Sequence, residues 1–359
     1  HHRRLWHRVD LMIRRDQIAD AQPSPPDTPL VDRHGRRIRY LRLSVTDRCN
    51  LRCRYCMPLG GEDHVPHTMV LSYEEMLRII GICTGRGVRK VRITGGEPLT
   101  RKGIVQFIER LSALGGVRDV SLTTNGVLLA GMAGDLKKAG LQRVNVSLDT
   151  LDRAKFSHIT RVDAFNDVIR GICAAYEHGL HPVKINVVAI RGFNDCEIED
   201  FARLTLRLPV EVRFIELMPV GCITKYPENE HISGREIRER IEERFGELHR
   251  LEGGLGPASM YRIPGAEGLV GIIGALSEHE FCVSCNRIRI TARGRLRTCL
   301  FSEDELDLLG PMRNGVTDGE LERLIEDGVR MKPPAHGVCR GAAHVHGGLL
   351  RTGMSRIGG

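Results

Sequence analysis

The sequence predicts an α/β protein, a partial (open) barrel of six β/α units with a C-terminal α+β extension. From residue 38 onward, short runs rich in β-branched residues alternate with helical runs, which is typical of parallel strands joined by helices. Six units are too few to close the eight-stranded barrel that this pattern otherwise builds. Beyond residue 220 the alternation gives way to one charged helix and short strands, which indicates a different second part.

The expected elements of the barrel follow one another along the chain. We expect strands near residues 38–45, 89–94, 118–124, 143–149, 183–190 and 210–217. We expect helices near residues 72–86, 101–114, 128–139, 165–179 and 196–207. The first helix begins after Ser72, and Glu75 completes the Ser-x-x-Glu pattern of a capping box. In the extension we expect a helix over 233–246 and strands near 259–263 and 269–273.

The chain is expected to divide into four parts. Residues 1–34 form an arm and linker, since Pro23-Ser24-Pro25-Pro26 cannot join a helix or a sheet. The barrel covers 35–220, the extension 221–330, and a tail 331–359.

The composition is that of an ordinary globular protein, with 27% charged and 41% hydrophobic residues. No apolar run approaches the roughly 18 residues of a membrane span, so no membrane partner is expected. The net charge of +8 suits a nucleic acid or a small polyanion such as a nucleoside triphosphate. With 4% aromatic residues the chain has few stacking platforms, which argues against nucleic acid.

The use of cysteine indicates a reducing compartment. Six of the eleven cysteines fall into two ligand-like groups, and no secretory signal precedes them. We therefore expect a cytoplasmic protein. Five arginines among the first fifteen residues leave a remnant of an organelle transit peptide as the alternative.

Alternate residues of four successive strands are polar, and the residues between them are apolar. Because side chains of a strand point alternately to two faces, the apolar set should meet the helices and the polar set should line the interior. Buried polar groups without partners cost about 1–3 kcal/mol each, so the interior should hold a polar ligand. The polar set is Lys90, Arg92, Thr94, Ser121, Thr123, Asn125, Asn145, Ser147, Asp149, Lys184 and Asn186.

Three cysteines, Cys49, Cys53 and Cys56, follow the first expected strand at the spacing C-x3-C-x2-C. Three thiolates in one tight loop are ligands of the kind that iron–sulfur clusters use. Because a [4Fe–4S] cluster has four irons, three thiolates leave one iron open to a small molecule. A structural zinc loop is the alternative, although zinc loops favour cysteine pairs closed by a second pair.

Two glycines and an acid follow the second expected strand as Gly95-Gly96-Glu97. The carboxyl ends of parallel strands are where such folds place their chemistry. The glycines let the backbone approach a ligand, and Glu97 offers a hydrogen-bond acceptor.

A second group of three cysteines, Cys282, Cys285 and Cys299, lies in the extension. His279 could complete a zinc site there, which is the alternative to a second cluster. Arg287 and Arg289 alternate along the strand expected after Cys285, and two arginines beside a cluster suit an anion or a guanine edge. Since no Gly-x4-Gly-Lys-Ser/Thr loop is present, side chains must hold any nucleotide.

The first cysteine loop, with Tyr55 just before its last cysteine, resembles that of the radical S-adenosylmethionine (SAM) family. Over about 35–300, and again over 354–359, the chain resembles the GTP 3′,8-cyclase family of molybdenum cofactor biosynthesis. The stretches that carry this resemblance are 41–50, 92–99, 145–149, 184–188, 214–219 and 282–289. It implies a fold of the radical SAM type and a second iron–sulfur cluster in the extension.

The resemblance also implies a role for each matching residue. Cys49, Cys53 and Cys56 would hold a [4Fe–4S] cluster that binds SAM, and Cys282, Cys285 and Cys299 would hold a second [4Fe–4S] cluster that receives guanine. The SAM contacts would be Tyr55, Gly96, Ser147 and Met218. The GTP contacts would be Arg42, Arg92, Thr123, Lys184, Arg287, Ile288 and Arg289. Gly358 and Gly359 would end a tail that catalysis requires.

The implied reaction takes a hydrogen atom from C3′ of GTP and joins that carbon to C8 of guanine. The implied product, 3′,8-cyclo-7,8-dihydro-GTP, would pass to a separate cyclic pyranopterin monophosphate synthase. The resemblance further implies an external electron donor and a homodimer. A radical SAM peptide-modifying enzyme and a non-enzymatic metal-binding nucleic-acid module are the alternatives.

The chain departs from the family pattern over about 331–353. His336, Cys339, His344 and His346 lie there in a glycine-rich run, which we interpret as a mobile loop, with a metal site as the alternative. The other cysteines are expected to be buried as small apolar residues. They are Cys83, Cys173, Cys196 and Cys222.

Overall fold

The computed structural model describes residues 28–57, 65–219, 228–252, 256–277, 280–336 and 357. The expected boundary at residue 220, most of the expected arm, His279, Cys222 and most of the tail lie outside these residues. Within them, no helix is long and apolar enough to cross a membrane.

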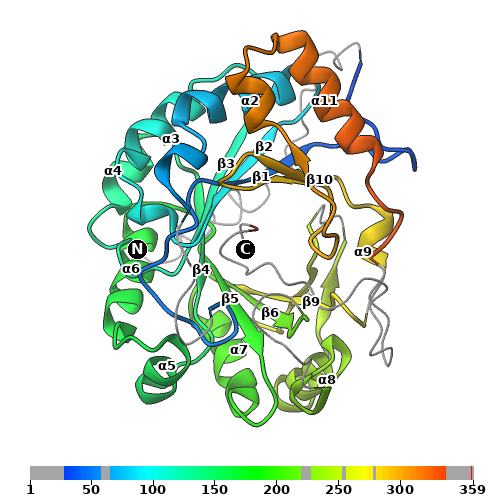
Figure 1. Ribbon diagram of the computed structural model, residues 1–359. Helices are drawn as coiled ribbons and strands as arrows, with labels where there is room; N and C mark the ends of the chain where they lie inside the picture. The colour runs from blue at the N-terminus through cyan, green and yellow to red at the C-terminus, as the bar shows by residue number, and fades with distance from the viewer. Residues whose placement is uncertain are drawn as a thin grey trace, which may run out of the picture.

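The six predicted barrel strands are confirmed, in the predicted order. They are β1 (Tyr40–Ser44), β2 (Lys90–Thr94), β3 (Asp119–Thr124), β4 (Arg143–Ser147), β5 (Lys184–Ala189) and β6 (Glu211–Glu216). Each pairs in parallel with the next, and Figure 1 shows them curving around a central space.

The extension prolongs the barrel sheet at both edges instead of forming a sheet of its own. Its strands are β7 (His249–Leu251), β8 (Ser259–Arg262), β9 (Leu269–Ile273), β10 (Arg287–Ile290), β11 (Arg295–Arg297) and β12 (Leu306–Asp307). Strand β9 pairs in parallel with β6, and β10 pairs in parallel with β1. The order of the sheet runs β12-β11-β10-β1-β2-β3-β4-β5-β6-β9-β8-β7, so the described sheet is open, as predicted. The extension thus covers the two edges that an isolated barrel of six strands would expose.

The helices lie outside the sheet, as Figure 1 shows. Five match the predicted barrel helices: α2 (Tyr73–Gly85), α3 (Ile104–Ser112), α4 (Ala133–Lys138), α6 (Phe165–Glu177) and α7 (Ile198–Arg207). The predicted capping box of α2 is present, because Ser72 Oγ accepts from the Glu75 N–H and the Glu75 carboxylate accepts from the Ser72 N–H. Helix α8 (Gly234–Phe245) is the charged helix expected in the extension.

Other elements were not predicted. They are the strands β7, β11 and β12, the helices α5 (Arg153–Thr160), α9 (Glu280–Val283), α10 (Leu309–Arg313) and α11 (Asp318–Arg330), and the 3-10 turns η1 (His67–Met69), η2 (Pro98–Thr100), η3 (Asp195–Glu197) and η4 (Glu228–Glu230). Helix α5 buries the side chains of Phe156, Ile159 and Thr160, which is too few for a clear helical period in the sequence.

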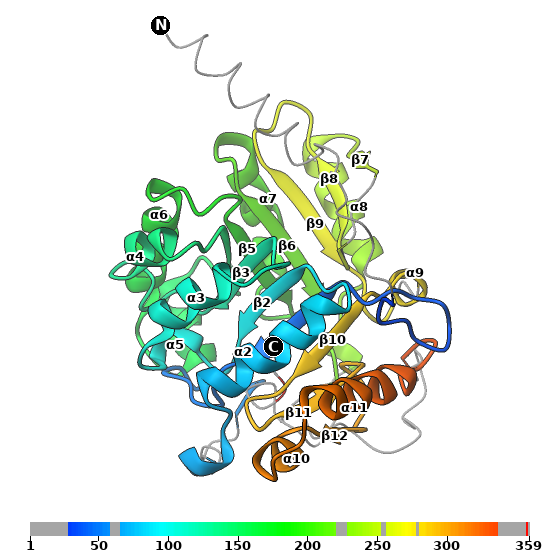
Figure 2. The same ribbon diagram turned by 90° about the horizontal axis from the view of Figure 1, so that it is seen from above.

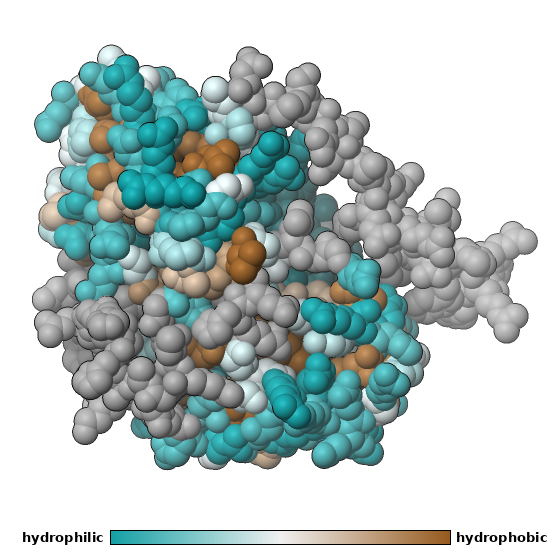
Figure 3. All heavy atoms as spheres, turned by 90° about the vertical axis from the view of Figure 1, so that its right-hand side faces the viewer, coloured by the Kyte–Doolittle hydropathy of each residue, from teal (hydrophilic) through white to brown (hydrophobic). Residues whose placement is uncertain are grey.

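The core lies between the sheet and the helices. The apolar residues of alternate strand positions are buried there, as predicted, against apolar side chains of the helices such as Ile79, Phe107 and Phe201. Of the other cysteines, Cys83 is buried as expected, but Cys173 and Cys196 are exposed, so the prediction was wrong for those two. On the face drawn in Figure 3, apolar residues outside the grey atoms form small groups separated by hydrophilic ones.

The last residue of β6, Glu216, ties the barrel to the extension. Its buried carboxylate accepts from the N–H groups of Gly234 at 2.7 Å, Leu276 at 2.7 Å and Ser277 at 3.0 Å. Burial alone would raise the pKa of Glu216, but His231 at 3.8 Å, the Ser277 hydroxyl and these N–H groups lower it to about 2. The charged form is therefore the one that the fold stabilises.

We expect this carboxylate to make stability depend on pH in acid. The contribution is fully present above the ordinary glutamate pKa of about 4.5 and is lost as the pH falls from there toward 2. Glu216→Gln should therefore lower the free energy of unfolding by about 3 kcal/mol at pH 7. Urea unfolding at a series of pH values measures this free energy for the native protein and for the variant. The gap between them should shrink below pH 4.5, and a constant gap would contradict this assignment.

Candidate active site

Both cysteine triads line one cavity of about 340 Å³ inside the barrel. Its wall includes Cys49, Cys53, Cys56, Cys282, Cys285 and Cys299. The reason is the pairing of β10 with β1, which sets Arg287 opposite Tyr40 and so brings the segment with Cys282 and Cys285 beside the barrel strands. Cysteines far apart in the sequence therefore face one space.

A row of arginines crosses the wall of this cavity on three adjacent strands. Arg42 of β1 is the register partner of Arg92 on β2 and of Arg289 on β10. Burial and, to a smaller extent, repulsion by Arg289 together lower the pKa of Arg42 to about 9. Burial likewise lowers the pKa of Arg92 and that of Arg289 to about 10. Crowded, desolvated positive charge of this kind favours binding of a polyanion.

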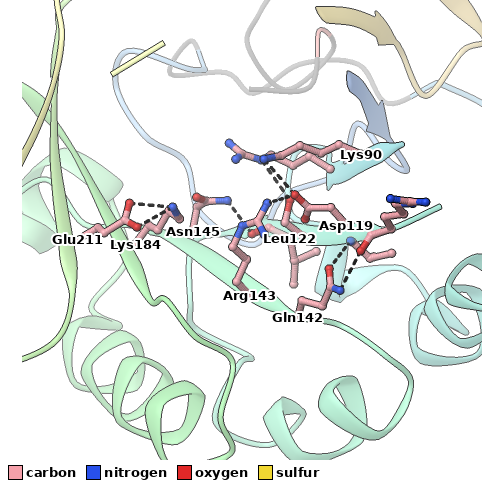
Figure 4. Close-up of polar contacts among 12 residues, drawn as sticks. Lys90, Asp119, Leu122, Gln142, Arg143, Asn145, Lys184 and Glu211 are labelled. Carbon is pink, nitrogen blue, oxygen red and sulfur yellow. Dashed lines mark hydrogen bonds and ion pairs between the residues drawn. The ribbon is translucent and has the colours of Figure 1, made fainter. Parts of the chain in front are cut away.

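Ion pairs continue the polar face on the neighbouring strands (Figure 4). The Lys184 ammonium lies 2.7 Å and 2.8 Å from the two carboxylate oxygens of Glu211, and Arg213 binds the same carboxylate at 2.7 Å. Burial lowers the pKa of Lys184 to about 7, and the Arg213 charge acts in the same direction. Across the sheet, Asp119 pairs with Lys90 at 3.0 Å and with Arg143. Lys184 is thus already paired within the protein, and it is not among the cavity residues.

The Gly95-Gly96-Glu97 turn holds the first cysteine loop by close backbone contact. The Gly96 N–H donates to Thr46 O at 2.8 Å, and the Glu97 N–H donates to Arg48 O at 2.7 Å. A Cβ atom on Gly96 would lie 2.4 Å from Arg48 O, so only glycine allows this approach.

Glu97 supports this loop from within the protein, whereas the sequence suggested an acceptor for a ligand. Its buried carboxylate accepts from the N–H groups of Leu99 at 3.0 Å and Asn125 at 2.7 Å, and from the Thr124 hydroxyl at 2.8 Å. Burial raises the pKa of Glu97 to about 7, although these bonds oppose the rise. The Asn125 amide then donates toward Cys49 Sγ at 3.8 Å. This chain of contacts fixes the position of one thiol.

Asp149 positions Tyr55 on the other side of the loop. The Tyr55 hydroxyl donates to the Asp149 carboxylate at 2.6 Å, and the Val188 N–H donates to the other carboxylate oxygen at 2.9 Å. The Asn194 amide donates to Asp149 O at 2.6 Å. The ring of Tyr55 is therefore held against the cavity by three strand-end segments.

The thiols of each triad repel one another when charged. Burial raises the pKa of Cys53 to about 12, with the charges of Asp149 and Cys49 acting in the same direction. Burial also raises the pKa of Cys282, as do the charges of Cys299 and Cys285. A bound cationic cluster would relieve this repulsion, so the donor set fits one.

Cys285 differs from the other thiols. Burial opposes its ionisation, but the nearby charges of Arg287 and Lys332 lower its pKa to about 6. It is thus prepared as a thiolate ligand. No three Cys, His, Asp or Glu side chains of the described residues converge at the distances of a single metal ion.

Most residues predicted to bind SAM and GTP meet in this cavity. Those in its wall are Tyr55, Gly96, Ser147, Met218, Arg42, Arg92, Thr123, Arg287 and Arg289. Ile288 is fully buried between Arg287 and Arg289 along β10, with its side chain in the core. Gly358 and Gly359 lie outside the described residues, but the buried side chain of Ile357 packs against Met218, Leu300 and Phe301 of the cavity wall.

Two cavity residues differ from what the sequence reasoning assigned: Arg213 was not named, and His336 was expected in a mobile loop. Arg213 continues the polar alternation onto the sixth strand, where the same pattern could have found it. His336 is buried and stacks near Phe301, with ring centroids 4.7 Å apart, although we expected it in a mobile loop. Its possible companions Cys339, His344 and His346 lie outside the described residues.

Two family models match the chain. The radical SAM superfamily matches residues 43–205, and Molybdenum Cofactor Synthesis C matches residues 210–338. A GTP 3′,8-cyclase of Desulforamulus reducens is 50% identical over 333 residues, which cover 92% of this chain and all of that protein. The chain belongs to the GTP 3′,8-cyclase family.

Other members of the GTP 3′,8-cyclase family agree with this assignment. The cyclase of Heliobacterium modesticaldum is 50% identical over 86% of this chain and 94% of its own. That of Geobacter sulfurreducens is 47% identical over 92% of this chain and 99% of its own.

Among solved structures, Streptococcus suis SuiB bound to S-adenosylmethionine superposes with a TM-score of 0.57, at 16% identity over 82% of this chain and 68% of that one. That likeness shows the fold alone, which a GTP 3′,8-cyclase thus shares with SuiB.

Proposed function

We infer that this chain is a GTP 3′,8-cyclase, which converts GTP to 3′,8-cyclo-7,8-dihydro-GTP in the first step of molybdenum cofactor biosynthesis. The observation that carries this inference is a single cavity lined by both cysteine triads and a row of arginines. The test is anaerobic incubation with SAM, GTP and a reductant. It should yield 5′-deoxyadenosine together with the cyclised nucleotide, identified by mass.

Family membership implies a [4Fe–4S] cluster and SAM, and we assign their binding to the first triad. Cys49, Cys53 and Cys56 would hold the cluster, and Tyr55, Gly96, Ser147 and Met218 would contact SAM. When bound, the cluster and SAM supply the 5′-deoxyadenosyl radical that takes the hydrogen atom from C3′. Glu97 and Asp149, through Asn125 and Tyr55, would hold these binding groups in place.

We assign a second [4Fe–4S] cluster to Cys282, Cys285 and Cys299, which line the same cavity as the first triad. GTP would lie between the two triads, with Arg42, Arg92, Thr123, Arg287 and Arg289 around it. A triphosphate would offset the charge that now depresses the pKa values of Arg42, Arg92 and Arg289. Lys184 and Ile288 do not line the cavity, so they would support GTP binding indirectly, through the residues that do.

The proposed reaction also requires partners. We propose an external electron donor, a separate cyclic pyranopterin monophosphate synthase that takes the product, and a homodimer in the cytoplasm. A peptide-modifying activity has no support beyond a fold shared with SuiB. If the chain were a nucleic-acid-binding module, the cavity would have no function.

The first prediction about the function concerns the clusters. The anaerobically reconstituted chain should hold about eight irons, four for each [4Fe–4S] centre. Replacing Cys49, Cys53 and Cys56 by Ala should leave about four irons and abolish SAM cleavage. Replacing Cys282, Cys285 and Cys299 should also leave about four and abolish cyclisation. Cys173→Ala, at an exposed cysteine, is the matched control and should change neither quantity. Stoichiometric zinc in the second site after anaerobic purification would refute this assignment.

The second prediction concerns the arginine row. Arg92→Ala should weaken GTP binding by about 1.5–3 kcal/mol, more than tenfold, because it removes one charge-assisted contact. SAM binding should change by less than about twofold. Lys184→Ala should act in the same direction but less strongly, because Glu211 already neutralises that ammonium. Equilibrium binding of both ligands measures this, with the exposed Arg207→Ala as control. Equal losses for SAM and GTP would mean that the row is misassigned.

The third prediction concerns the tail. Because Ile357 packs on the cavity wall, we propose that Gly358 and Gly359 continue toward the reacting groups. Deleting the two glycines should cut cyclisation at least about a hundredfold, roughly 2.7 kcal/mol of barrier. Iron content and GTP affinity should stay nearly intact, and residues added after Gly359 should do similar harm. Normal turnover by the shortened chain would show that the tail is only a frayed end.

A further inference from the structure

We propose that a basic cavity on the outer side of the first cysteine loop is the docking site of an acidic one-electron carrier protein. This inference rests on the proposed function, since only a reducible cluster at the first triad needs such a partner. The basic cavity measures about 480 Å³, and its basic residues are Arg48, His67, Arg101, Lys102 and Arg313.

The position of the basic cavity is the first argument. Its wall includes Val45, Thr46, Asp47 and Arg48, the residues directly before Cys49. The cavity of the active site includes Cys49 itself, and the two walls share no residue. The chain between Arg48 and Cys49 therefore separates the two spaces. An electron that enters from the basic cavity reaches a cluster ligand through one peptide link.

The approach through the active-site cavity would be blocked in the working enzyme. SAM and GTP would fill that space during the reaction, so a protein reductant has to dock elsewhere. Helices lie around the outside of the sheet (Figure 1). The basic cavity lies beside the loop itself, formed by segments that follow β1, the cysteine loop and β2, together with Arg313 of α10.

Charge is the second argument. Arg48, His67 and Lys102 are exposed in the wall of the basic cavity. Two acids lie near it in the described part of the chain: Asp47 is buried and accepts from the Val65 N–H at 3.0 Å, and Glu75 is bound by Arg313 at 2.8 Å. Among the described residues, basic side chains therefore outnumber acidic ones at this surface.

Two other arginines of the wall, half-buried Arg101 and exposed Arg313, are held in place by the protein. Arg101 donates to Leu71 O at 2.7 Å and lies 4.2 Å from the centre of the Tyr73 ring. Arg313 donates to Val70 O at 3.1 Å. The turn η1 precedes Val70 and includes Met69, a residue that is 45% exposed. An exposed apolar residue beside a fixed positive rim suits a small, transient interface with an acidic protein.

The test compares two reductants on the same reconstituted chain. Stopped-flow absorbance follows bleaching of the first cluster by a reduced acidic flavodoxin, or by dithionite, a small reductant that needs no docking site. Arg48→Glu combined with Lys102→Glu should slow reduction by flavodoxin at least about tenfold, because both charges face the partner. Reduction by dithionite, iron content and SAM cleavage driven by dithionite should stay unchanged.

A matched control separates position from net charge. Arg207 at the end of α7 and Arg250 in β7 are exposed, and Figure 2 shows α7 and β7 at the end of the molecule away from α10. Arg207→Glu combined with Arg250→Glu changes the net charge by the same amount and should leave both rates intact. Lys102→Glu alone, outside the loop itself, should give an intermediate effect and guards against damage to residues 46–48.

Salt gives an independent readout. Raising the ionic strength from about 0.05 M to about 0.5 M should slow reduction of the native chain by flavodoxin and have little effect on the doubly reversed variant. Equal slowing by both charge-reversed pairs, or by neither, would overturn the docking site. A chain that dithionite cannot reduce, or that does not cleave SAM after reduction, would instead contradict the proposed function.

Discussion

The structure depends on one pairing, the parallel contact of β10 with β1. It joins a strand of the extension to the first strand of the barrel in a fixed register, with Arg287 opposite Tyr40 and Arg289 opposite Arg42. A slip of one residue would turn both arginines toward the core and Ile288 toward the cavity, because strand side chains alternate between faces. The same register brings the second cysteine triad to the wall of the cavity that the first triad also lines.

The polar interior is costly for the fold. Several half-buried arginines share one wall, and the pKa values of Arg42 and Arg289 fall because they are largely removed from water and like charges are close. Removing charges from water is unfavourable, so this wall costs the fold stability. The ion pairs of Glu211 and Asp119 offset part of this cost. A bound polyanion would offset more, so the substrate that we propose would also stabilise the protein that binds it.

Much of this arrangement could be predicted from the sequence. Strand alternation gave the six barrel strands and their polar face, because a period of two is a local property of the chain. The cysteine loop and the capping box of α2 are likewise local patterns. The role of Glu97 could not be foreseen, since it depends on Leu99, Thr124 and Asn125 meeting one buried carboxylate. The pairing of Lys184 with Glu211 was not predicted either, because the two residues lie on neighbouring strands and the sequence does not reveal the register between them.

The position of the extension strands has a consequence for synthesis of the chain. Strand β1 leaves the ribosome long before β10, and β6 leaves before β9, so both outer strands of the barrel wait for partners made later. Pairings between distant parts of a chain form slowly, and open strand edges in the meantime can pair with other chains. The barrel is therefore exposed to aggregation until the extension is complete. Conditions that lengthen this interval, such as slow translation beyond residue 220, should lower the yield of folded protein. The loss should be larger than for a protein whose barrel folds without an extension.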